Sequence, residues 1–232
     1  MIHVIYMAAG NSRRFGSNKL LYLYEGKPLY RHGLELLLKL KQEMGEKLTV
    51  TVVTQYPEIL EKVQDIFERC GMTGMQAVFC EESRMGASYT IRAGIEAVIS
   101  QDPASGQAKA GQPMIGEKDY FLFMVADQPH LTLDSVRKLI RAAVSRAQAA
   151  SSGSLAEECS RSETLSLCCG STPGNPCMFR ADLIPELMTL TGDQGGRKVL
   201  KRHACKYVDI LDERELEDVD EMLQVAENLG EK

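Results

Sequence analysis

The stretch VIYMAAGNSRRFGSNKLL, residues 4–21, decides how the chain begins to fold. An apolar run over residues 2–9 stops at Gly10, which is the pattern of a buried strand that ends in a turn. Two arginines, a second glycine and Lys19 follow within nine residues. A basic loop with glycines directly after a strand indicates a site for phosphate.

The spacing of this loop differs from two common phosphate-binding patterns. A P-loop has four residues between its glycines and Lys directly after the second. Here five residues separate Gly10 from Gly16, and two more precede Lys19. The pattern G-x-G-x-x-G does not fit either. Spacing alone therefore leaves open a solvated basic turn.

The residue types of the loop nevertheless suit a polyphosphate. Gly10 lets the chain turn so that backbone N–H groups can point at an anion. Ser12 can donate a hydrogen bond, Arg14 can hold two phosphate oxygens with its fork of donors, and Lys19 adds a compact charge. We therefore interpret residues 10–19 as a phosphate-binding loop.

The composition is that of an ordinary globular protein. The chain has 232 residues, 44% hydrophobic and 25% charged, with a net charge of -5. This charge gives no overall attraction for nucleic acid or an anionic membrane, so an anion site must be built locally. The sequence shows neither a signal peptide nor an apolar run of the roughly 20 residues that span a bilayer. We expect a cytoplasmic protein with no nucleic-acid or membrane partner.

The seven cysteines indicate free thiols. Their number is odd and no C-x-x-C pair occurs, which argues against a disulfide framework and against a zinc site. Free thiols fit a reducing cytoplasm. We expect Cys168, Cys169 and Cys177 to be small buried residues, with a catalytic thiol as the alternative.

Strands and helices alternate along the chain. The pattern predicts strands over residues 1–9, 48–54, 76–80, 119–126, 165–169 and 206–211. It predicts helices over residues 28–42, 57–70, 87–100, 133–150 (with Thr132 as N-cap), 182–190, 195–203 and 213–228. This order predicts an α/β fold with a mostly parallel central sheet and helices on both faces. We interpret residues 1–232 as a single domain with local surface insertions at 101–118 and 151–163.

An acidic residue follows the most apolar predicted strand. The segment FMVADQPHLT, residues 123–132, places Asp127 directly after that strand, where ligands of parallel sheets bind. An NTP needs Mg²⁺, which proteins hold with one or two carboxylates and phosphate oxygens. Asp127 is therefore the candidate metal ligand, with a helix cap or a turn aspartate as the alternative.

The first loop resembles the opening signature of the MobA-like nucleotidyltransferases of the molybdenum-cofactor group. The pattern A-A-G-x-S-x-R-x-G-x-x-K matches Ala8, Ala9, Gly10, Ser12, Arg14, Gly16 and Lys19. The resemblance implies a Rossmann-like three-layer fold, shared with the nucleotide-diphospho-sugar transferases. It also implies that the loop wraps the triphosphate of an NTP, and that Arg14 and Lys19 balance its charge as catalytic residues.

Two later segments extend the resemblance around Asp127. The segment ADQP, residues 126–129, resembles the metal-binding segment of the molybdopterin cytidylyltransferases, whose guanylyl relatives carry C-D-x-P there and A-G-G in the first loop. Gln128 and Pro129 are thereby implied to bind substrate. Near the end, LEDVDEMLQVAENL (residues 216–229) resembles a segment whose second aspartate, here Asp220, completes the metal site. The family's Thr-Pro-Glu is missing at residues 221–223, and Asp218 fits equally an acidic helix start.

Three further segments resemble the family's substrate pockets. RMGASYTIRAGIEA (residues 84–97) implies that Ser88 and Arg92 lie near the base and ribose, with a capping role for Ser88 as the alternative. GSTPGNPCMFRADLIPEL (170–187) and TGDQGGRKVL (191–200) resemble the pocket of the second substrate, the molybdopterin. The matching residues are Gly174, Asn175, Pro176, Phe179, Gly192, Asp193, Gly195 and Arg197. Arg197 could meet the pterin phosphate, and Asp193 could bind substrate or cap a helix.

The resemblance implies transfer of CMP from CTP to the terminal phosphate of a molybdopterin cofactor, with release of pyrophosphate. Mg²⁺ is the implied cofactor, on Asp127 and Asp220. One alternative is a related transferase that uses GTP or another phosphate acceptor. Another is a non-catalytic accessory protein that hands finished cofactor to a molybdenum hydroxylase.

Overall fold

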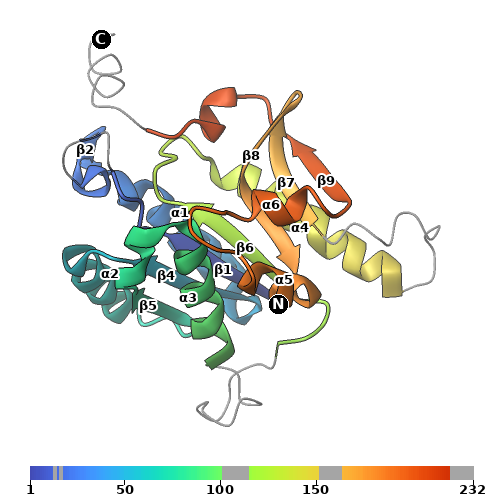
Figure 1. Ribbon diagram of the computed structural model, residues 1–232, viewed down its shortest axis with the longest axis horizontal. Helices are drawn as coiled ribbons and strands as arrows, with labels where there is room; N and C mark the ends of the chain where they lie inside the picture. Colours follow the sequence, from blue (N-terminus) through green and yellow to red (C-terminus); the bar gives the residue numbers. More distant parts are fainter. Residues whose placement is uncertain (13–14, 16–17, 101–114, 152–163, 220–232) are drawn as a thin grey trace.

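A computed structural model describes residues 1–12, 15, 18–100, 115–151 and 164–219. The main strands are β1 (Ile2–Met7), β4 (Leu48–Thr54), β5 (Met75–Phe79), β6 (Tyr120–Val125), β7 (Thr164–Cys169), β8 (Thr172–Arg180) and β9 (Cys205–Asp209). They form one sheet in the order β5-β4-β1-β6-β8-β7-β9 (Figure 1). A small hairpin, β2 (Leu23–Tyr24) and β3 (Lys27–Pro28), stands apart from this sheet.

The sheet is mostly parallel and changes direction at one strand. β1 pairs in parallel with β4 and with β6, β4 with β5, and β7 with β9. β8 alone runs antiparallel, and it pairs with β6 on one side and β7 on the other. An antiparallel strand begins where its parallel neighbours end. The start of β8 therefore lies at the same edge of the sheet as the carboxyl ends of β1 and β6.

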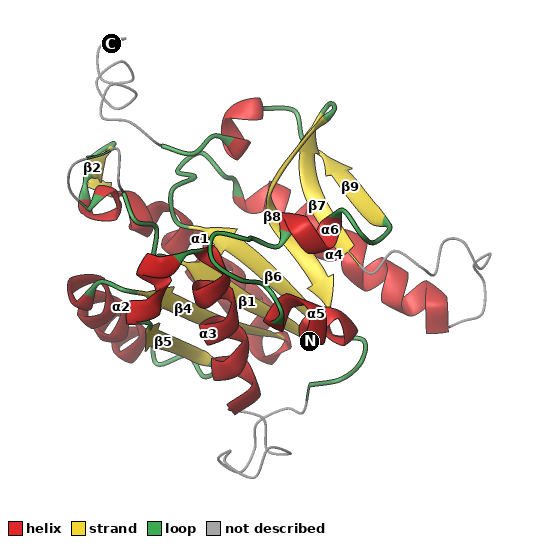
Figure 2. Ribbon diagram, in the orientation of Figure 1, coloured by secondary structure: helices red, strands yellow, loops and turns green. Residues whose placement is uncertain are grey.

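Helices cover both faces of the sheet and make three layers (Figure 2). Side chains of α1 (Leu29–Met44), α2 (Pro57–Cys70) and α4 (Leu133–Ser151) pack with Val4 and Tyr6 of β1 in one core. Those of α3 (Ala87–Ser100), α5 (Ile184–Met188) and α6 (Arg197–Leu200) pack with Ile5 in a second core. Alternate residues of a strand point to opposite faces, so β1 contributes to both cores and is buried throughout its centre. The predicted α/β fold with a mostly parallel sheet is confirmed.

The predicted elements of the first half agree closely with the structure. β4, α2 and α3 have the predicted bounds, and Thr132 caps α4 by accepting a hydrogen bond from the Ser135 N–H at 3.2 Å. Among the described residues, no helix combines the length and the apolar character needed to cross a membrane. The proposed insertions at 101–118 and 151–163 fall mostly outside the described residues, so the single domain stays a prediction.

The strand β8 was not predicted, because Pro173, Gly174 and Pro176 indicate a loop. These residues lie in the first half of β8, which pairs with β7 only; β6 pairs with residues 177–180. A proline without an N–H donor is tolerated where one side of the strand is open. The register also shifts between Ser166 and Leu167 of β7, opposite this stretch.

The predicted helix over residues 213–228 is wrong in its described part. Residues 213–216 form a short 3-10 helix, and the side chain of Asp212 caps its start. Residues 217–219 are not helical. The N–H of Val219 donates to the carbonyl of Asp127 at 2.9 Å, so it is not available to a helix. Residues 220–228 lie outside the described part of the chain. The predicted helices over 182–190 and 195–203 are realised as the shorter α5 and α6.

Helix α3 lies directly on β1 at Gly94. A Cβ atom at Gly94 would stand 2.5 Å from Cγ2 of Ile5. Ile5 is β-branched and completely buried, so its side chain cannot turn away. The distance between α3 and β1 therefore depends on the absence of a side chain at this position.

Gly94→Ala should lower the free energy of unfolding by roughly 1–3 kcal/mol, the usual cost of overpacking a core. Helix propensity alone would favour Ala over Gly by about 0.5–1 kcal/mol, so the two effects have opposite signs. Urea denaturation measures the difference. In an Ile5→Ala protein, Gly94→Ala should cost less than it does in the wild type, because the methyl group of Ile5 that would clash with the new Cβ is absent. A gain in stability on Gly94→Ala would contradict the close contact.

Candidate functional site

The parallel pairing of β1 with β6 brings two loops together. Met7 and Val125 are register partners at the carboxyl ends of these strands. The N–H of Ala126 donates to the carbonyl of Met7 at 3.2 Å, and that of Ala8 to Val53 at 2.9 Å. The first loop and the Asp127 turn therefore leave the sheet side by side, as predicted for ligand sites in parallel sheets.

A cleft of about 360 Å³ opens at this edge of the sheet. It receives residues from the first loop, from the Asp127 turn, from the segment before and at the start of α3, and from the segment before α6. The lining residues are Met7, Ala9, Gly10, Asn11, Leu20, Ser83, Gly86, Ala87, Thr90, Val125, Ala126, Asp127 and Asp193. Four of the segments singled out in the sequence thus meet at one cavity.

The first loop is held to the end of β4 through its backbone. The side chain of Gln55 donates to the carbonyl of Ala9 at 2.6 Å, and the hydroxyl of Tyr56 donates to that of Gly10 at 2.6 Å. Ser12 lies further along, where its Oγ accepts from the N–H of Lys19 at 3.1 Å. Ala8 is fully buried beneath the loop. Arg14 and Gly16, two predicted members of the loop, lie outside the described residues.

Lys19 joins three distant parts of the chain. Its Nζ lies 2.8 Å from Oδ2 of Asp127 and donates to the carbonyl of Val219 at 2.9 Å. The side chains of Lys19 and Asp127 are only 8% and 19% exposed. A charged pair this far from water attracts strongly, and it is costly to break because each group would remain poorly solvated.

The Asp127 region provides oxygen atoms that suit a hard divalent cation. The Asp127 carboxylate and the Val219 carbonyl both contact the ammonium of Lys19, so their oxygens face one cationic group. Mg²⁺ takes such oxygen ligands and keeps several waters. No cluster of three or more His, Cys, Asp or Glu that could hold a metal occurs among the described residues, and Asp220 lies beyond them.

The residues that follow Asp127 are joined to the segment 212–219. Gln128 is buried, and its side-chain amide donates to the carbonyl of Leu216 at 3.0 Å. Glu215 accepts hydrogen bonds from the N–H and the hydroxyl of Thr132 at 2.9 and 2.8 Å. Pro129 lies in the turn that separates Gln128 from Thr132. The role of Glu215 was missed in the sequence, because no spacing pattern relates it to Thr132.

The start of α3 is joined to the segment before α6. The N–H of Ser88 donates to the carbonyl of Gly192 at 3.1 Å, and the Ser88 side chain is fully buried. A Cβ on Gly86 would stand 2.3 Å from the carbonyl carbon of Gly192, so these backbones meet only because Gly86 has no side chain. Arg92 donates to the carbonyl of Leu190. Ser88 and Arg92 are thus attached to this segment, while Gly86 lines the cleft.

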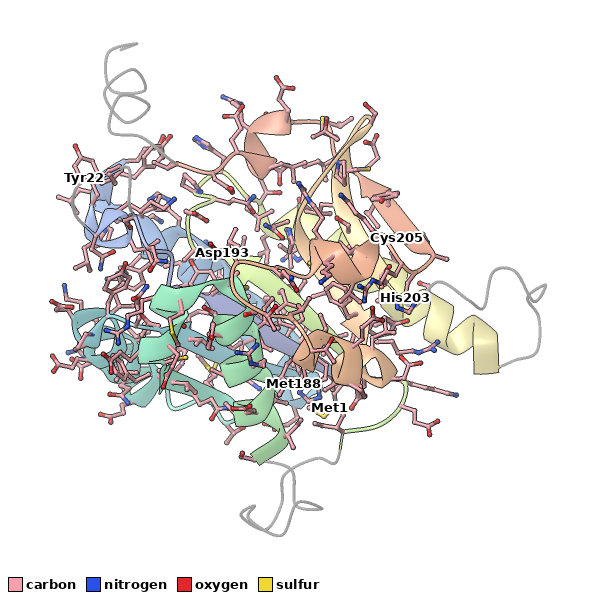
Figure 3. The ribbon with its side chains drawn as sticks, viewed as in Figure 1. Met1, Tyr22, Met188, Asp193, His203 and Cys205 are labelled. Carbon is pink, nitrogen blue, oxygen red and sulfur yellow. The ribbon has the colours of Figure 1, made fainter. Side chains whose placement is uncertain are left out.

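The residues predicted for the second substrate form two groups. Gly174, Asn175 and Pro176 lie in the first half of β8, and Arg197 at the start of α6 donates to the carbonyl of Pro173 at 3.0 Å. Asp193 belongs instead to the cleft itself. Figure 3 shows Asp193 near the middle of the view, where the segment between α5 and α6 passes the start of α3. Asp193 therefore lines the same cleft as Asp127, and Arg197, four residues further on, contacts β8.

The cysteines near β8 are free thiols, and most of them are buried or partly buried. Burial raises the pKa of the Cys177 thiol to about 12, and it raises the pKa of Cys168 and Cys205 as well. Cys168 and Cys177 are buried and Cys169 is partly buried, and the described cysteines are unbridged. A thiol with a raised pKa carries little thiolate at neutral pH and reacts slowly. This agrees with the predicted packing role.

Comparison with known proteins at the level of sequence identifies a family and a relative. The sequence model of the MobA-like NTP transferase domain matches residues 4–207. The purine catabolism protein PucB of Bacillus subtilis is 25% identical over 223 residues, which cover 93% of this chain and 90% of PucB.

Two solved structures share the fold at low identity. Rv0371c of Mycobacterium tuberculosis superposes with a TM-score of 0.62 at 16% identity, over 100% of this chain and 98% of that chain. The 4-diphosphocytidyl-2C-methyl-D-erythritol synthase of Anaerococcus prevotii gives a TM-score of 0.61 at 13% identity, over 97% and 95% of the two chains. At these identities the likeness concerns the fold alone.

Lys19→Met should lower the free energy of unfolding by roughly 2–4 kcal/mol, because it takes the ammonium away from Asp127 and Val219 in a poorly hydrated place. Urea denaturation measures this change. Lys27→Met is the matched control: Lys27 lies 2.6 Å from Glu35, but both side chains are 36% exposed. Removing that surface pair should cost at most about 1 kcal/mol. Equal effects of the two substitutions would contradict a special role for Lys19.

Proposed function

The chain belongs to the MobA-like NTP transferase family, and we propose that it transfers CMP from CTP to the terminal phosphate of a molybdopterin-type cofactor, releasing pyrophosphate. The observation that carries this proposal is the composition of the cleft. The first loop, the Asp127 turn and Asp193 of the GDQGGR segment all line it. A nucleotide at the first loop and an acceptor at the β8 side would meet beside Asp127.

The donor side suits a nucleoside triphosphate. The cleft has the volume of a small-molecule site. Ala8, Ala9, Gly10, Ser12, Gly16, Arg14 and Lys19 would surround the phosphates, as the sequence pattern implies, while Ser88 and Arg92 would act at the base and ribose end. Arg14 and Lys19 would neutralise the charge on the leaving pyrophosphate.

A divalent cation would complete the site, with Mg²⁺ as the proposed ion. Asp127 would hold it, together with Asp220 from the segment that follows Val219. Rv0371c has also been solved in complex with manganese, at a TM-score of 0.59 and 16% identity, which supports divalent-metal use in this fold. The ion would supply positive charge at the α-phosphate and at the incoming phosphate.

In the proposed reaction, the protein contributes by positioning the two substrates and by neutralising their charge. The phosphate of the acceptor is already ionised at neutral pH, so its attack on the α-phosphorus needs no general base. The bond from the α-phosphorus to the bridging oxygen breaks as the new one forms, and pyrophosphate leaves with the electron pair. Holding the two substrates in line accounts for a large share of such a rate enhancement.

The acceptor side is proposed to consist of Gln128, Pro129, Gly174, Asn175, Pro176, Asp193 and Arg197. Arg197 is exposed and lies on the same side as the start of β8. A guanidinium there can bind the phosphate of a pterin bidentately. An apoenzyme of the molybdenum hydroxylase class would receive the product.

Cytosine is the proposed base of the donor nucleotide for two reasons. The sequence carries Ala-Ala-Gly at residues 8–10 and Ala-Asp-Gln-Pro at residues 126–129, which resemble the cytidylyl branch. One protein of the same fold is, by its name, a 4-diphosphocytidyl-2C-methyl-D-erythritol synthase, which supports cytidyl chemistry on this architecture.

Asp127→Asn should lower the rate of transfer by roughly 10²–10³-fold, the scale on which one electrostatic contact to a developing charge acts. Release of pyrophosphate from CTP, Mg²⁺ and molybdopterin is the measurement, and circular dichroism checks that the fold is kept. Asp134→Asn, on exposed helix surface at the start of α4, is the control and should retain activity. Turnover at the wild-type rate by Asp127→Asn would refute the metal assignment.

CTP should be used with a kcat/KM at least about tenfold above that for GTP, which corresponds to about 1.4 kcal/mol of discrimination. Parallel assays with CTP, GTP and ATP at equal Mg²⁺ test this. Equal or better use of GTP or ATP would refute the cytidine proposal and leave the transfer reaction standing. Binding of molybdopterin without turnover of any nucleotide would favour the non-catalytic accessory role instead.

A further inference from the structure

Arg92 is held on two sides by the protein itself. Its guanidinium donates to the carbonyl of Leu190, and its Cζ lies 4.5 Å from the centroid of the Tyr89 ring. The Tyr89 ring packs on one face of the guanidinium, and the Leu190 carbonyl accepts from Nη1, so two contacts within the protein fix the position of Arg92. Arg92 is not among the residues that line the cleft.

The Leu190 contact is one of three along a short segment, residues 190–193. The carbonyl of Gly192 accepts from the N–H of Ser88 at 3.1 Å. The backbone of Gly192 lies so close to Gly86 that a Cβ there would be 2.3 Å away. The next residue, Asp193, lines the cleft together with Gly86. In Figure 1 the segment between α5 and α6 passes the start of α3.

We propose that Arg92 is a positioning residue that fixes the 190–193 segment on α3, so that the carboxylate of Asp193 stands in the cleft where the nucleotide binds. The inference rests on the proposed function. It replaces direct contact between Arg92 and the nucleotide with an indirect role, exerted through Asp193. It also makes the 190–193 segment a common wall of the donor and acceptor sides.

Arg92 can position Asp193 because only a few contacts hold the 190–193 segment on α3. Asp193 is exposed, and its position depends on the backbone that precedes it. Loss of the guanidinium would remove a charge-assisted hydrogen bond at Leu190 and leave the Ser88 bond to Gly192 in place. The segment would therefore loosen without unfolding.

A double-mutant cycle tests the proposal with CTP and Mg²⁺ as the probe and calorimetric Kd as the readout. Arg92→Met should weaken binding about tenfold, and Arg92→Lys, which keeps a donor for Leu190, should recover most of it. In the Asp193→Ala protein, Arg92→Met should cost less than about twofold, because the residue it positions is gone. An equal loss in both backgrounds would show that Arg92 acts on nucleotide binding independently of Asp193, and would overturn the proposal. Unchanged binding of CTP by Arg92→Met or by Asp193→Ala would also overturn the proposal.

Amide hydrogen exchange provides a second readout that needs no nucleotide. Peptides that cover residues 86–92 and 189–194 should exchange faster in Arg92→Met than in the wild type. The N–H of Ser88 is released more often from the carbonyl of Gly192, and the N–H of Gln194 is released more often from that of Thr191 once the segment loosens. Arg69→Met, an exposed arginine in the last turn of α2, is the matched control and should leave both peptides unchanged. Unchanged exchange in Arg92→Met would overturn the positioning role.

The two readouts separate this inference from the proposed function. If the wild type binds no nucleotide at all, nucleotidyl transfer fails as the function, and the exchange data alone decide whether Arg92 holds the segment. If nucleotide binds and the cycle is additive, the transfer proposal stands and the positioning role fails.

Discussion

The parallel pairing of β1 with β6 is the constraint on which the site depends. Met7 and Val125 are register partners, so the loops after both strands leave the sheet at the same height. Lys19 and Asp127 are more than one hundred residues apart, yet Nζ and Oδ2 lie 2.8 Å from each other because of this pairing. A slip of the register would separate the first loop from the carboxylate of Asp127. The buried apolar side chains of both strands on both faces of the sheet hold the register in place.

The first half of the fold could be predicted from the sequence, since its signals are local. β-branched runs, helical periodicity and turn residues define β4, α2 and α3, and these have the predicted bounds. The meeting of the first loop with Asp127 could also be predicted, because both follow apolar strands and strand ends of a parallel sheet share one edge. Asp193 was assigned to the second substrate, and its place in the cleft follows from a chain path that no local pattern encodes.

The second half depends on tertiary contacts that leave no local signal. β8 contains two prolines and a glycine in its first half, and it forms because β7 alone pairs there. Residues 217–219 leave the helical path because the Val219 N–H bonds to Asp127 instead. The partners of Arg92 and Glu215 are likewise distant in sequence. In each case a contact with a remote element overrides the local preference.

The contacts between the two halves have an evolutionary consequence. Lys19, Gln128 and Arg92 belong to the early part of the chain, and each donates to a backbone carbonyl of the late part, at Val219, Leu216 and Leu190. A carbonyl is supplied by every amino acid, so these three hydrogen bonds do not depend on the side chains at positions 190, 216 and 219, whereas Glu215 acts through its own side chain. Substitutions within residues 172–197 that keep the backbone path would therefore leave the hydrogen bond between Arg92 and Leu190 in place.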